Sequence, residues 1–170
     1  MARLVLLGGG ESGIGTAILG KQKGYEVFLS DKGKIQDRYK DVLKHIGIDW
    51  EEEKHTEAII LNADLVMKSP GIPDTVALVV RLRSLGVPVV SEIEFAAKYT
   101  KATIVGITGS NGKTTTTMLV YHLLKQGGLK VGMAGNIGDS FAKMVAENDF
   151  DFYVLEISSF QLDGILAFKP

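Results

Sequence analysis

The chain has 170 residues, of which 45% are hydrophobic and 23% charged, so it can bury a sizeable core and is globular rather than disordered. A formal net charge of −1 and the lack of a long apolar stretch indicate a cytoplasmic protein with no nucleic-acid or membrane partner. The absence of cysteine excludes disulfides and thiolate metal sites.

A glycine-rich turn follows the first predicted strand, Arg3–Leu7. The turn has the spacing G-x-G-x-x-G and leads into a helix predicted from Gly13 to about Lys23. Such a turn leaves a helix N-terminus open to an anionic ligand, but glycines are also needed merely to pack a helix closely on a strand. The glycines that set the spacing are Gly8, Gly10 and Gly13.

An acidic residue ends the second predicted strand, Glu26–Ser30. Asp31 lies where Rossmann domains place a carboxylate on a ribose, so NAD(P) or FAD binding is an open alternative at this point. The next segment is polar, and we expect Ile48–His55, with its run of three glutamates, to be a solvated face.

The rest of the first hundred residues alternates between predicted helices and strands, which is typical of a parallel α/β sheet. A turn at Ser69-Pro70-Gly71 follows one of these strands, on the edge where open α/β sheets bind ligands. Tyr99–Ala102 has the character of a linker, so we place a domain boundary near residue 100. The predicted helices are 37–46, 75–85 and 91–99, and the predicted strands are 63–67 and 87–90.

A second strand–loop–helix unit begins after the linker. Ile104–Ile107 predicts a buried strand, Thr108–Gly112 a tight loop, and Lys113–Gln126 an amphipathic helix. Loop amides and a helix N-terminus can surround phosphates, Lys113 can contact the β/γ-phosphates, and Thr114 can bind Mg²⁺. We interpret this unit as an ATP site.

The loop departs from the general P-loop pattern. G-x-x-x-x-G-K-S/T requires glycine at position 107, where this chain has Ile107. An ordinary turn before a lysine is therefore the alternative. Four consecutive threonines are poor helix interior, but at a helix start their hydroxyls can cap or bind a ligand.

Two further strands are predicted beyond this helix, at Leu129–Met133 and Asp151–Leu155, with a helix at 140–147 between them. The last strand delivers Glu156 at its tip, where an ATPase places a second Mg²⁺ contact. Asn136 follows the other strand, so we expect it to face the same crevice. The second sheet is incomplete at the end of the chain, and we expect a truncated domain.

Two motifs resemble one family. Thr108–Thr115 resembles the T-G-S/T-N-G-K-S/T-T loop of the Mur ligases and folylpolyglutamate synthetases, which departs from the P-loop in the same place. Glu156–Leu162, E-I-S-S-F-Q-L, is similar to the segment of the Mur ligases that add D-glutamate, and Gly135–Gly138 also fits. The counterparts in the first hundred residues are the glycine turn, Asp31, Ser69–Gly71 and Ser91–Glu94.

The resemblance implies an α/β fold: a Rossmann-like parallel-sheet N-terminal domain at 1–100 that binds the UDP of a sugar nucleotide, then the first part of a P-loop-type ATPase central domain at 101–170. It implies that a third domain is absent. It also implies ATP-dependent amide formation in peptidoglycan precursor synthesis, with D-glutamate joined to UDP-N-acetylmuramoyl-L-alanine through an acyl phosphate. The chain alone is expected to bind ligands without turnover.

The predicted site residues fall into three groups. The ATP-binding residues are Gly109, Ser110, Asn111, Gly112, Lys113, Thr114 and Thr115; Thr114 and Glu156 are the Mg²⁺ ligands, and Lys113 and Glu156 the catalytic residues. The substrate-binding residues are Gly10, Ser12, Gly13, Ile14, Asp31, Lys32, Ser69, Pro70, Gly71, Asn136, Ser159 and Gln161.

Other interpretations remain open from the sequence. A nicotinamide- or flavin-dependent oxidoreductase would use the first glycine turn but leaves the second loop unexplained. A non-catalytic nucleotide-binding module and a Mur-family ligase for another amino acid are the remaining alternatives. The three histidines, His45, His55 and His122, have no partner spacing, and we expect structural roles for them.

Overall fold

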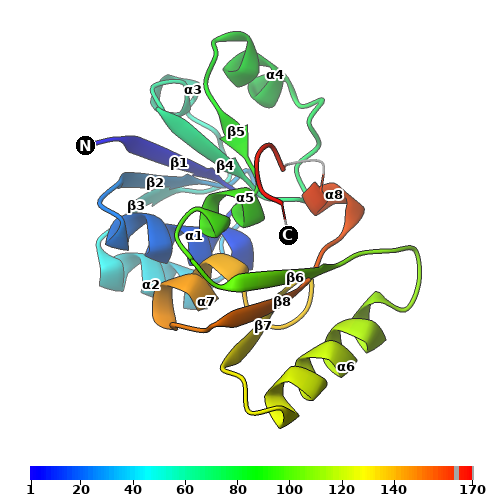
Figure 1. Ribbon diagram of the computed structural model, residues 1–170. Helices are drawn as coiled ribbons and strands as arrows, with labels where there is room; N and C mark the ends of the chain where they lie inside the picture. The colour runs from blue at the N-terminus through cyan, green and yellow to red at the C-terminus, as the bar shows by residue number, and fades with distance from the viewer. Residues whose placement is uncertain (163–164, 170) are drawn as a thin grey trace.

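The computed structural model describes residues 1–162 and 165–169, which form two parallel β-sheets with helices packed between and around them (Figure 1). The first sheet has five strands in the order β3-β2-β1-β4-β5. Its elements are β1 (Arg3–Leu7), α1 (Glu11–Gln22), β2 (Glu26–Ser30), α2 (Asp37–Ile46), β3 (Asp49–Glu51), α3 (Glu57–Ile60), β4 (Leu65–Lys68), α4 (Ala77–Ser84), β5 (Val89–Val90) and α5 (Glu92–Ala97).

The second sheet has three described strands in the order β6-β8-β7. Glu156 at the end of β8 pairs in register with Ile107 of β6 on one side and Gly135 of β7 on the other, so the three strands end at one edge. The elements of this half are β6 (Thr103–Ile107), α6 (Lys113–Gln126), β7 (Val131–Gly135), α7 (Phe141–Glu147), β8 (Phe152–Glu156) and α8 (Ser159–Leu162).

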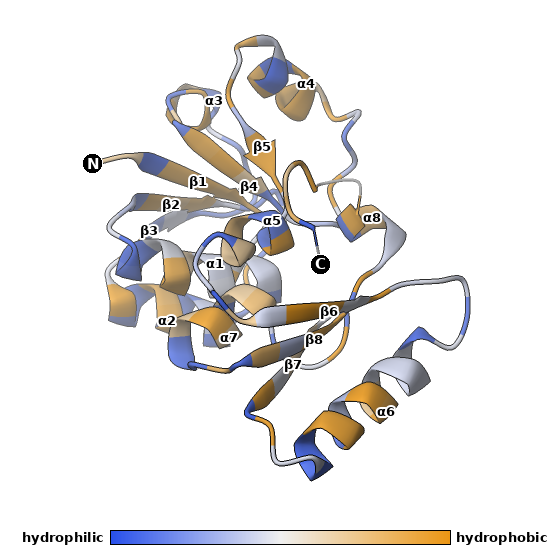
Figure 2. Ribbon diagram, viewed as in Figure 1, coloured by the Kyte–Doolittle hydropathy of each residue, from blue (hydrophilic) through white to orange (hydrophobic). Residues whose placement is uncertain are grey.

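One of the two hydrophobic clusters extends across both sheets. Strand β1 is apolar on both faces because helices cover both, and Leu4 to Leu7 are buried (Figure 2). Helix α7 from the second half packs on α1 of the first, and one cluster joins Leu4 and Ile14 with Phe141 and Tyr153. A Cβ on Gly15 of α1 would lie 1.8 Å from Ser140 Oγ, so only glycine permits this approach.

The structure differs from the sequence-based predictions in several places. The segment expected to be a solvated face contains strand β3, which pairs with β2, and Glu51 is 8% exposed. The polar sequence of this short edge strand did not indicate a strand. A glutamate can be buried when its carboxylate is hydrogen-bonded, and the sequence does not show those bonds. Helices α3 and α8 were not predicted, and the strand predicted at 129–133 lies at Val131–Gly135.

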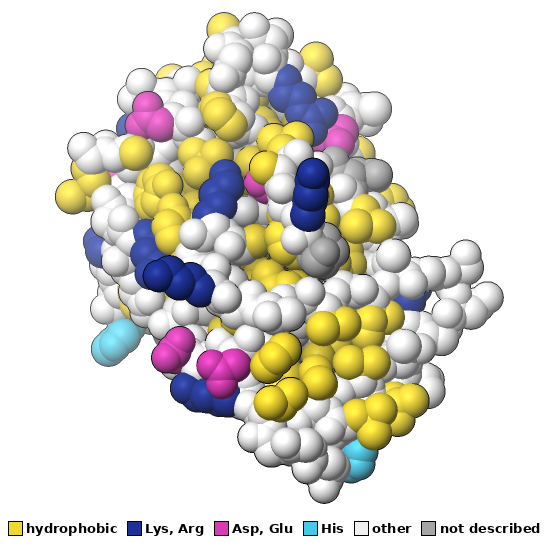
Figure 3. Space-filling model, in the orientation of Figure 1, with side chains coloured by type: hydrophobic (Ala, Val, Ile, Leu, Met, Phe, Trp, Pro, Cys, Tyr) yellow, Lys and Arg dark blue, Asp and Glu magenta, His cyan; other side chains and the backbone are white. Residues whose placement is uncertain are grey.

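Helix α6 leaves apolar side chains uncovered. Met118, Leu119 and Leu123 are each more than half exposed, whereas Thr117 on the opposite side is buried. Figure 3 shows hydrophobic side chains gathered over α6 and the neighbouring sheet. In the described ranges, no helix has the length and apolar character needed to cross a membrane.

Glu94 of α5 fixes the last described residues onto the first half. Its Oε2 accepts hydrogen bonds from the N–H groups of Leu166, Ala167 and Phe168 at 3.0, 3.1 and 3.0 Å. Burial alone would raise the pKa of this carboxyl, but the three N–H donors outweigh it and hold the pKa below the usual value. The ionised form is therefore favoured by folding.

We expect Glu94→Gln to lower the free energy of unfolding by about 1–2 kcal/mol at pH 7, because a neutral amide accepts these bonds more weakly. A depressed folded-state pKa gives stability above the unfolded pKa that is lost as the pH falls through the folded value. The difference between variant and wild type should therefore shrink in acid. Urea unfolding from pH 7 to pH 3 measures it, with Glu26→Gln at the exposed start of β2 as control. A difference independent of pH would contradict the assignment.

Candidate functional site

The loop between β6 and α6 has the backbone geometry of an anion site. Gly109 and Gly112 take φ values of 148° and 76°, which confirms the expected need for glycine there. The N–H groups of Lys113, Thr114 and Thr115 begin α6 and have no acceptor in the described part of the chain. These donors, together with the positive end of the helix, attract phosphate.

Lys113 lies over this loop. Its side chain is half-buried, and Nζ donates a hydrogen bond to the carbonyl of Gly109 at 2.9 Å. The ammonium group is therefore held beside the open amides, where it can exchange a neutral carbonyl acceptor for a more strongly accepting anion.

Glu156 joins the loop to the neighbouring strand. The residue is 1% exposed; its Oε2 accepts from Thr114 Oγ1 at 2.7 Å, and its Oε1 accepts from Asn136 Nδ2 at 2.7 Å. Strand register explains the meeting, because Glu156 pairs with the last residues of β6 and β7. The structure thus brings together Lys113, Thr114, Asn136 and Glu156 at one sheet edge, as the sequence predicts.

The donors at this edge fit a hard divalent cation. A carboxylate and a hydroxyl are oxygen ligands of the kind Mg²⁺ takes, and Mg²⁺ in nucleotide sites usually has few protein ligands besides phosphate oxygens and water. The described residues contain no group of three or more histidine, aspartate or glutamate side chains suited to a metal. A cation here would accordingly depend on a bound phosphate for the rest of its coordination.

A second candidate site lies at the carboxyl edge of the first sheet. This cavity of about 680 Å³, the glycine pocket, is bounded by the turns after β1, β2, β3 and β4. It brings together five predicted substrate residues, namely Gly10, Asp31, Lys32, Ser69 and Gly71. Other side chains on its wall are Glu53, Lys54, His55, Glu57, Ile72 and Val76.

Asp31 shapes the glycine pocket by holding its loops. Oδ2 accepts from Gly9 N–H at 2.5 Å and Oδ1 accepts from Gly33 N–H at 2.7 Å. Ser69 Oγ is buried beside Gly8 and has no hydrogen-bond partner among the described residues. A buried hydroxyl without a partner is costly, so this atom marks a place for a polar ligand.

Other predicted substrate residues lie elsewhere. Gly13 and Ile14 belong to the core: a Cβ on Gly13 would lie 2.0 Å from the carbonyl oxygen of Gly8, and the Ile14 side chain is 5% exposed. Their place in the sequence motif reflects close helix packing, so the prediction that they contact ligand is not supported by their positions. Ser12 is half-buried in the first turn of α1 and does not line the glycine pocket.

The predicted residues around α8 are also spread out. Pro70 lines a smaller cavity of about 410 Å³ with Phe160, which places α8 beside the turn after β4. Ser159 is exposed, whereas Gln161 is 6% exposed and its Oε1 accepts from the N–H and hydroxyl of Ser158 at 2.9 and 3.1 Å. Figure 1 shows the carboxyl ends of β1 and β8 directed toward the side of the molecule that carries α8.

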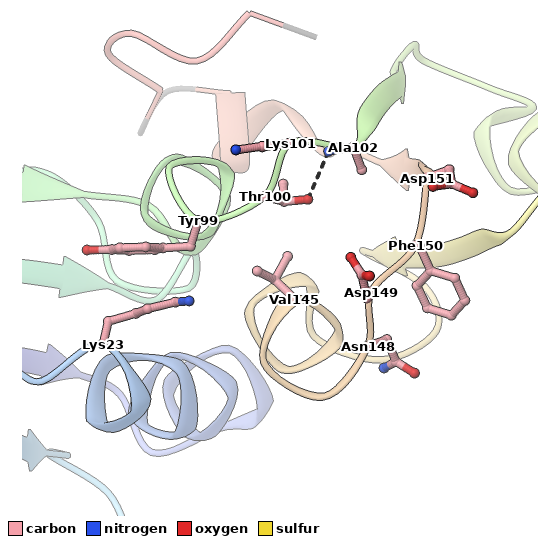
Figure 4. Close-up of a pocket in the computed structure, with 10 residues that line it drawn as sticks. All are labelled: Lys23, Tyr99, Thr100, Lys101, Ala102, Val145, Asn148, Asp149, Phe150 and Asp151. Carbon is pink, nitrogen blue, oxygen red and sulfur yellow. Dashed lines mark hydrogen bonds between the residues drawn. The ribbon is translucent and has the colours of Figure 1, made fainter.

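A further cavity of about 500 Å³ lies at the other end of the second sheet (Figure 4). Its wall includes Lys23, Tyr99, Val145 and Asp149, and the linker before β6. It adjoins the amino ends of β6 and β8, whereas Lys113 follows the carboxyl end of β6. None of the predicted site residues lines it.

Comparison with known proteins bears on both halves of the chain. Residues 3–77 match the family model described as MurD N-terminal domain, and residues 107–169 match the Mur ligase middle domain. A UDP-N-acetylmuramoylalanine–D-glutamate ligase of Christiangramia forsetii is 67% identical over 168 residues, which is 99% of this chain and 38% of that protein. The ligase of the same name from Bacteroides fragilis is 57% identical over 169 residues, with the same coverage. The chain thus spans 38% of the length of these relatives.

Solved structures show the same fold. A UDP-N-acetylmuramate:L-alanyl-gamma-D-glutamyl-meso-diaminopimelate ligase from Neisseria meningitides superposes with a TM-score of 0.60 at 24% identity, over 92% of this chain and 52% of that one. A pseudomurein peptide ligase type C from Methanothermus fervidus gives a TM-score of 0.56 at 29% identity, over 94% of this chain and 33% of the other.

Proposed function

The chain belongs to the Mur ligase family, and we propose that it serves the ATP-dependent joining of D-glutamate to UDP-N-acetylmuramoyl-L-alanine in peptidoglycan precursor synthesis. The names of the relatives at 67% and 57% identity support this choice of substrates over a ligase for another amino acid. Family membership also speaks against the oxidoreductase interpretation of the first glycine turn. The observation that carries the proposal is the contact of buried Glu156 with both Thr114 and Asn136.

The open amides of residues 113–115 support the assignment of an ATP site at the second sheet. In this proposal they hold the phosphates, and Lys113 contacts the terminal phosphate. Thr114 and Glu156 would hold Mg²⁺, which when bound would neutralise phosphate charge and help the phosphate accept a nucleophile.

The glycine pocket supports the assignment of a sugar-nucleotide site at the first sheet. Gly10 and the start of α1 would receive the diphosphate, because their N–H groups lie open and no side chain covers Gly10. Ser69 Oγ offers a polar contact that the protein itself does not satisfy. In this proposal, the first half of the chain binds the UDP portion of the sugar nucleotide.

The chemical difficulty of the reaction lies in bringing two anions together. A carboxylate has a poor leaving group, so it must first take a phosphoryl group from ATP to become an acyl phosphate, which the amine of D-glutamate can attack. Lys113 lowers the repulsion between the carboxylate and the phosphate by fixing positive charge between them. Asn136 donates a hydrogen bond to Glu156 at the same sheet edge and would orient the alanine end of the substrate.

A calorimetric titration tests the sugar-nucleotide assignment. We expect UDP-N-acetylmuramoyl-L-alanine to bind this chain at least about tenfold more tightly than UDP-N-acetylglucosamine, because only the former presents a carboxylate to the second sheet. NADH serves as the control for the dinucleotide alternative. Equal affinity for the two sugar nucleotides, or tighter binding of NADH, would overturn the assignment.

A further inference from the structure

Three side chains form a hydrogen-bonded chain at the wall of the glycine pocket. Ser30, fully buried at the end of β2, has its Oγ 2.7 Å from Glu51 Oε1 and 2.7 Å from His55 Nδ1. The Glu51 carboxylate also accepts from the N–H of Thr56 at 2.7 Å and from its hydroxyl at 2.5 Å. This series of hydrogen bonds connects a buried carboxylate to an imidazole that lines the pocket.

The proton positions follow from what each group can donate. Burial alone would raise the pKa of Glu51, but the hydrogen bonds from Thr56 and Ser30 hold it below its usual value, so the group is an ionised acceptor near neutral pH. Ser30 has one hydroxyl proton, which it donates to Glu51, so its oxygen must accept from His55 Nδ1–H. In the neutral imidazole, Nε2 then carries a lone pair.

The place of His55 in the pocket indicates which part of a ligand it meets. Its loop is tied to the turn after β2, because Glu53 N–H donates to the carbonyl of Gly33 at 3.1 Å and Lys54 N–H to that of Asp31 at 3.3 Å. In Rossmann-like domains the turn after the second strand faces the nucleoside, whereas the glycine turn faces the phosphates. The half-buried His55 has no partner for Nε2 among the described residues.

We propose that His55 is a specificity-determining residue of the glycine pocket, whose Nε2 accepts a hydrogen bond from an N–H or O–H group of the nucleoside part of the ligand. This inference rests on the proposed function, which places a uridine diphosphate there. Ser30 and Glu51 act as positioning residues, since they hold the imidazole in the tautomer that leaves Nε2 free to accept. Lys32 and Lys54 on the same wall provide charge for phosphate but no acceptor.

Binding calorimetry with UDP and with pyrophosphate tests the proposal on His55→Phe, which keeps a ring and removes both nitrogens. We expect UDP affinity to fall about five- to tenfold while pyrophosphate affinity is unchanged, because one net hydrogen bond to the nucleoside is lost. Ser30→Ala should weaken UDP binding less. This change removes the group that fixes the tautomer of His55, but it leaves the acceptor Nε2 in place. His122→Ala, on the exposed surface of α6, is the matched control. Parallel titrations with CDP and with 2′-deoxy-UDP show whether the donor is on the base or on the ribose.

A second measurement uses the wild-type chain and so does not depend on a variant folding. Imidazole ¹⁵N spectra at pH 8 should show His55 as the Nδ1–H tautomer, with the Nε2 signal shifting on addition of UDP. A dominant Nε2–H tautomer, or His55→Phe binding UDP as tightly as wild type, would overturn the role of His55 alone. Failure of the wild-type chain to bind UDP would overturn the proposed function and the role of His55 together.

Discussion

Replacing Lys113 by alanine is expected to slow acyl-phosphate formation by about 10²–10³-fold in a catalytically complete ligase containing this chain, because no other cation in the described loop neutralises the meeting anions. Folding should be almost unaffected. Among the described residues the Lys113 ammonium hydrogen-bonds only to the Gly109 carbonyl, and α6 does not depend on it. The rate is measured by trapping the acyl phosphate with hydroxylamine.

The control for this prediction is Lys125→Ala at the far end of α6, where Nζ donates to Tyr121 Oη at 3.2 Å. This variant should retain the wild-type rate. Both variants should melt within a few degrees of wild type. An alanine variant of Lys113 that forms the acyl phosphate at a near-normal rate would remove the lysine from the proposed mechanism.

Changing Gly13 to alanine is expected to lower the free energy of unfolding by about 3 kcal/mol. The added Cβ would lie 2.0 Å from the carbonyl oxygen of Gly8, which is backbone and cannot rotate away. Helix propensity would return about 1 kcal/mol at most, so the clash dominates. Thermal and urea unfolding measure the loss.

The matched control is Gly10→Ala, at the N-cap of α1. Gly10 has a φ of −83°, which alanine adopts, and its Cβ would meet no atom within 4 Å. This variant should keep wild-type stability yet weaken binding in the glycine pocket, because the methyl group occupies the path of an anion. Equal stability of the two variants would show that Gly13 is not a packing glycine.

Strong local patterns predicted most of the fold. Strands β1 and β8 were readable because apolar residues ran without interruption, as in strands covered on both faces. Strand β3 could not be predicted, because a glutamate such as Glu51 is expected to be exposed. Its burial depends on hydrogen bonds from Ser30 and Thr56. Those partners come from separate segments, and residue order alone does not reveal them.

The site at the edge of the second sheet was predicted more completely than the glycine pocket of the first sheet. Lys113, Thr114 and Glu156 follow directly from strand ends that parallel topology brings to one edge. In the first half, the same spacing rule selected Gly13 and Ile14, which pack in the core, and did not select His55, which lines the glycine pocket. No local pattern marks His55, because its position depends on the pairing of an edge strand.

The close approach of α1 and α7 at Gly15 and Ser140 has a consequence for molecular recognition. Helices packed this closely fix the separation between the two candidate anion-binding loops. A compound too short to reach from one loop to the other would contact only one of them. Compounds would therefore be distinguished by length at the binding step, before any bond is made or broken.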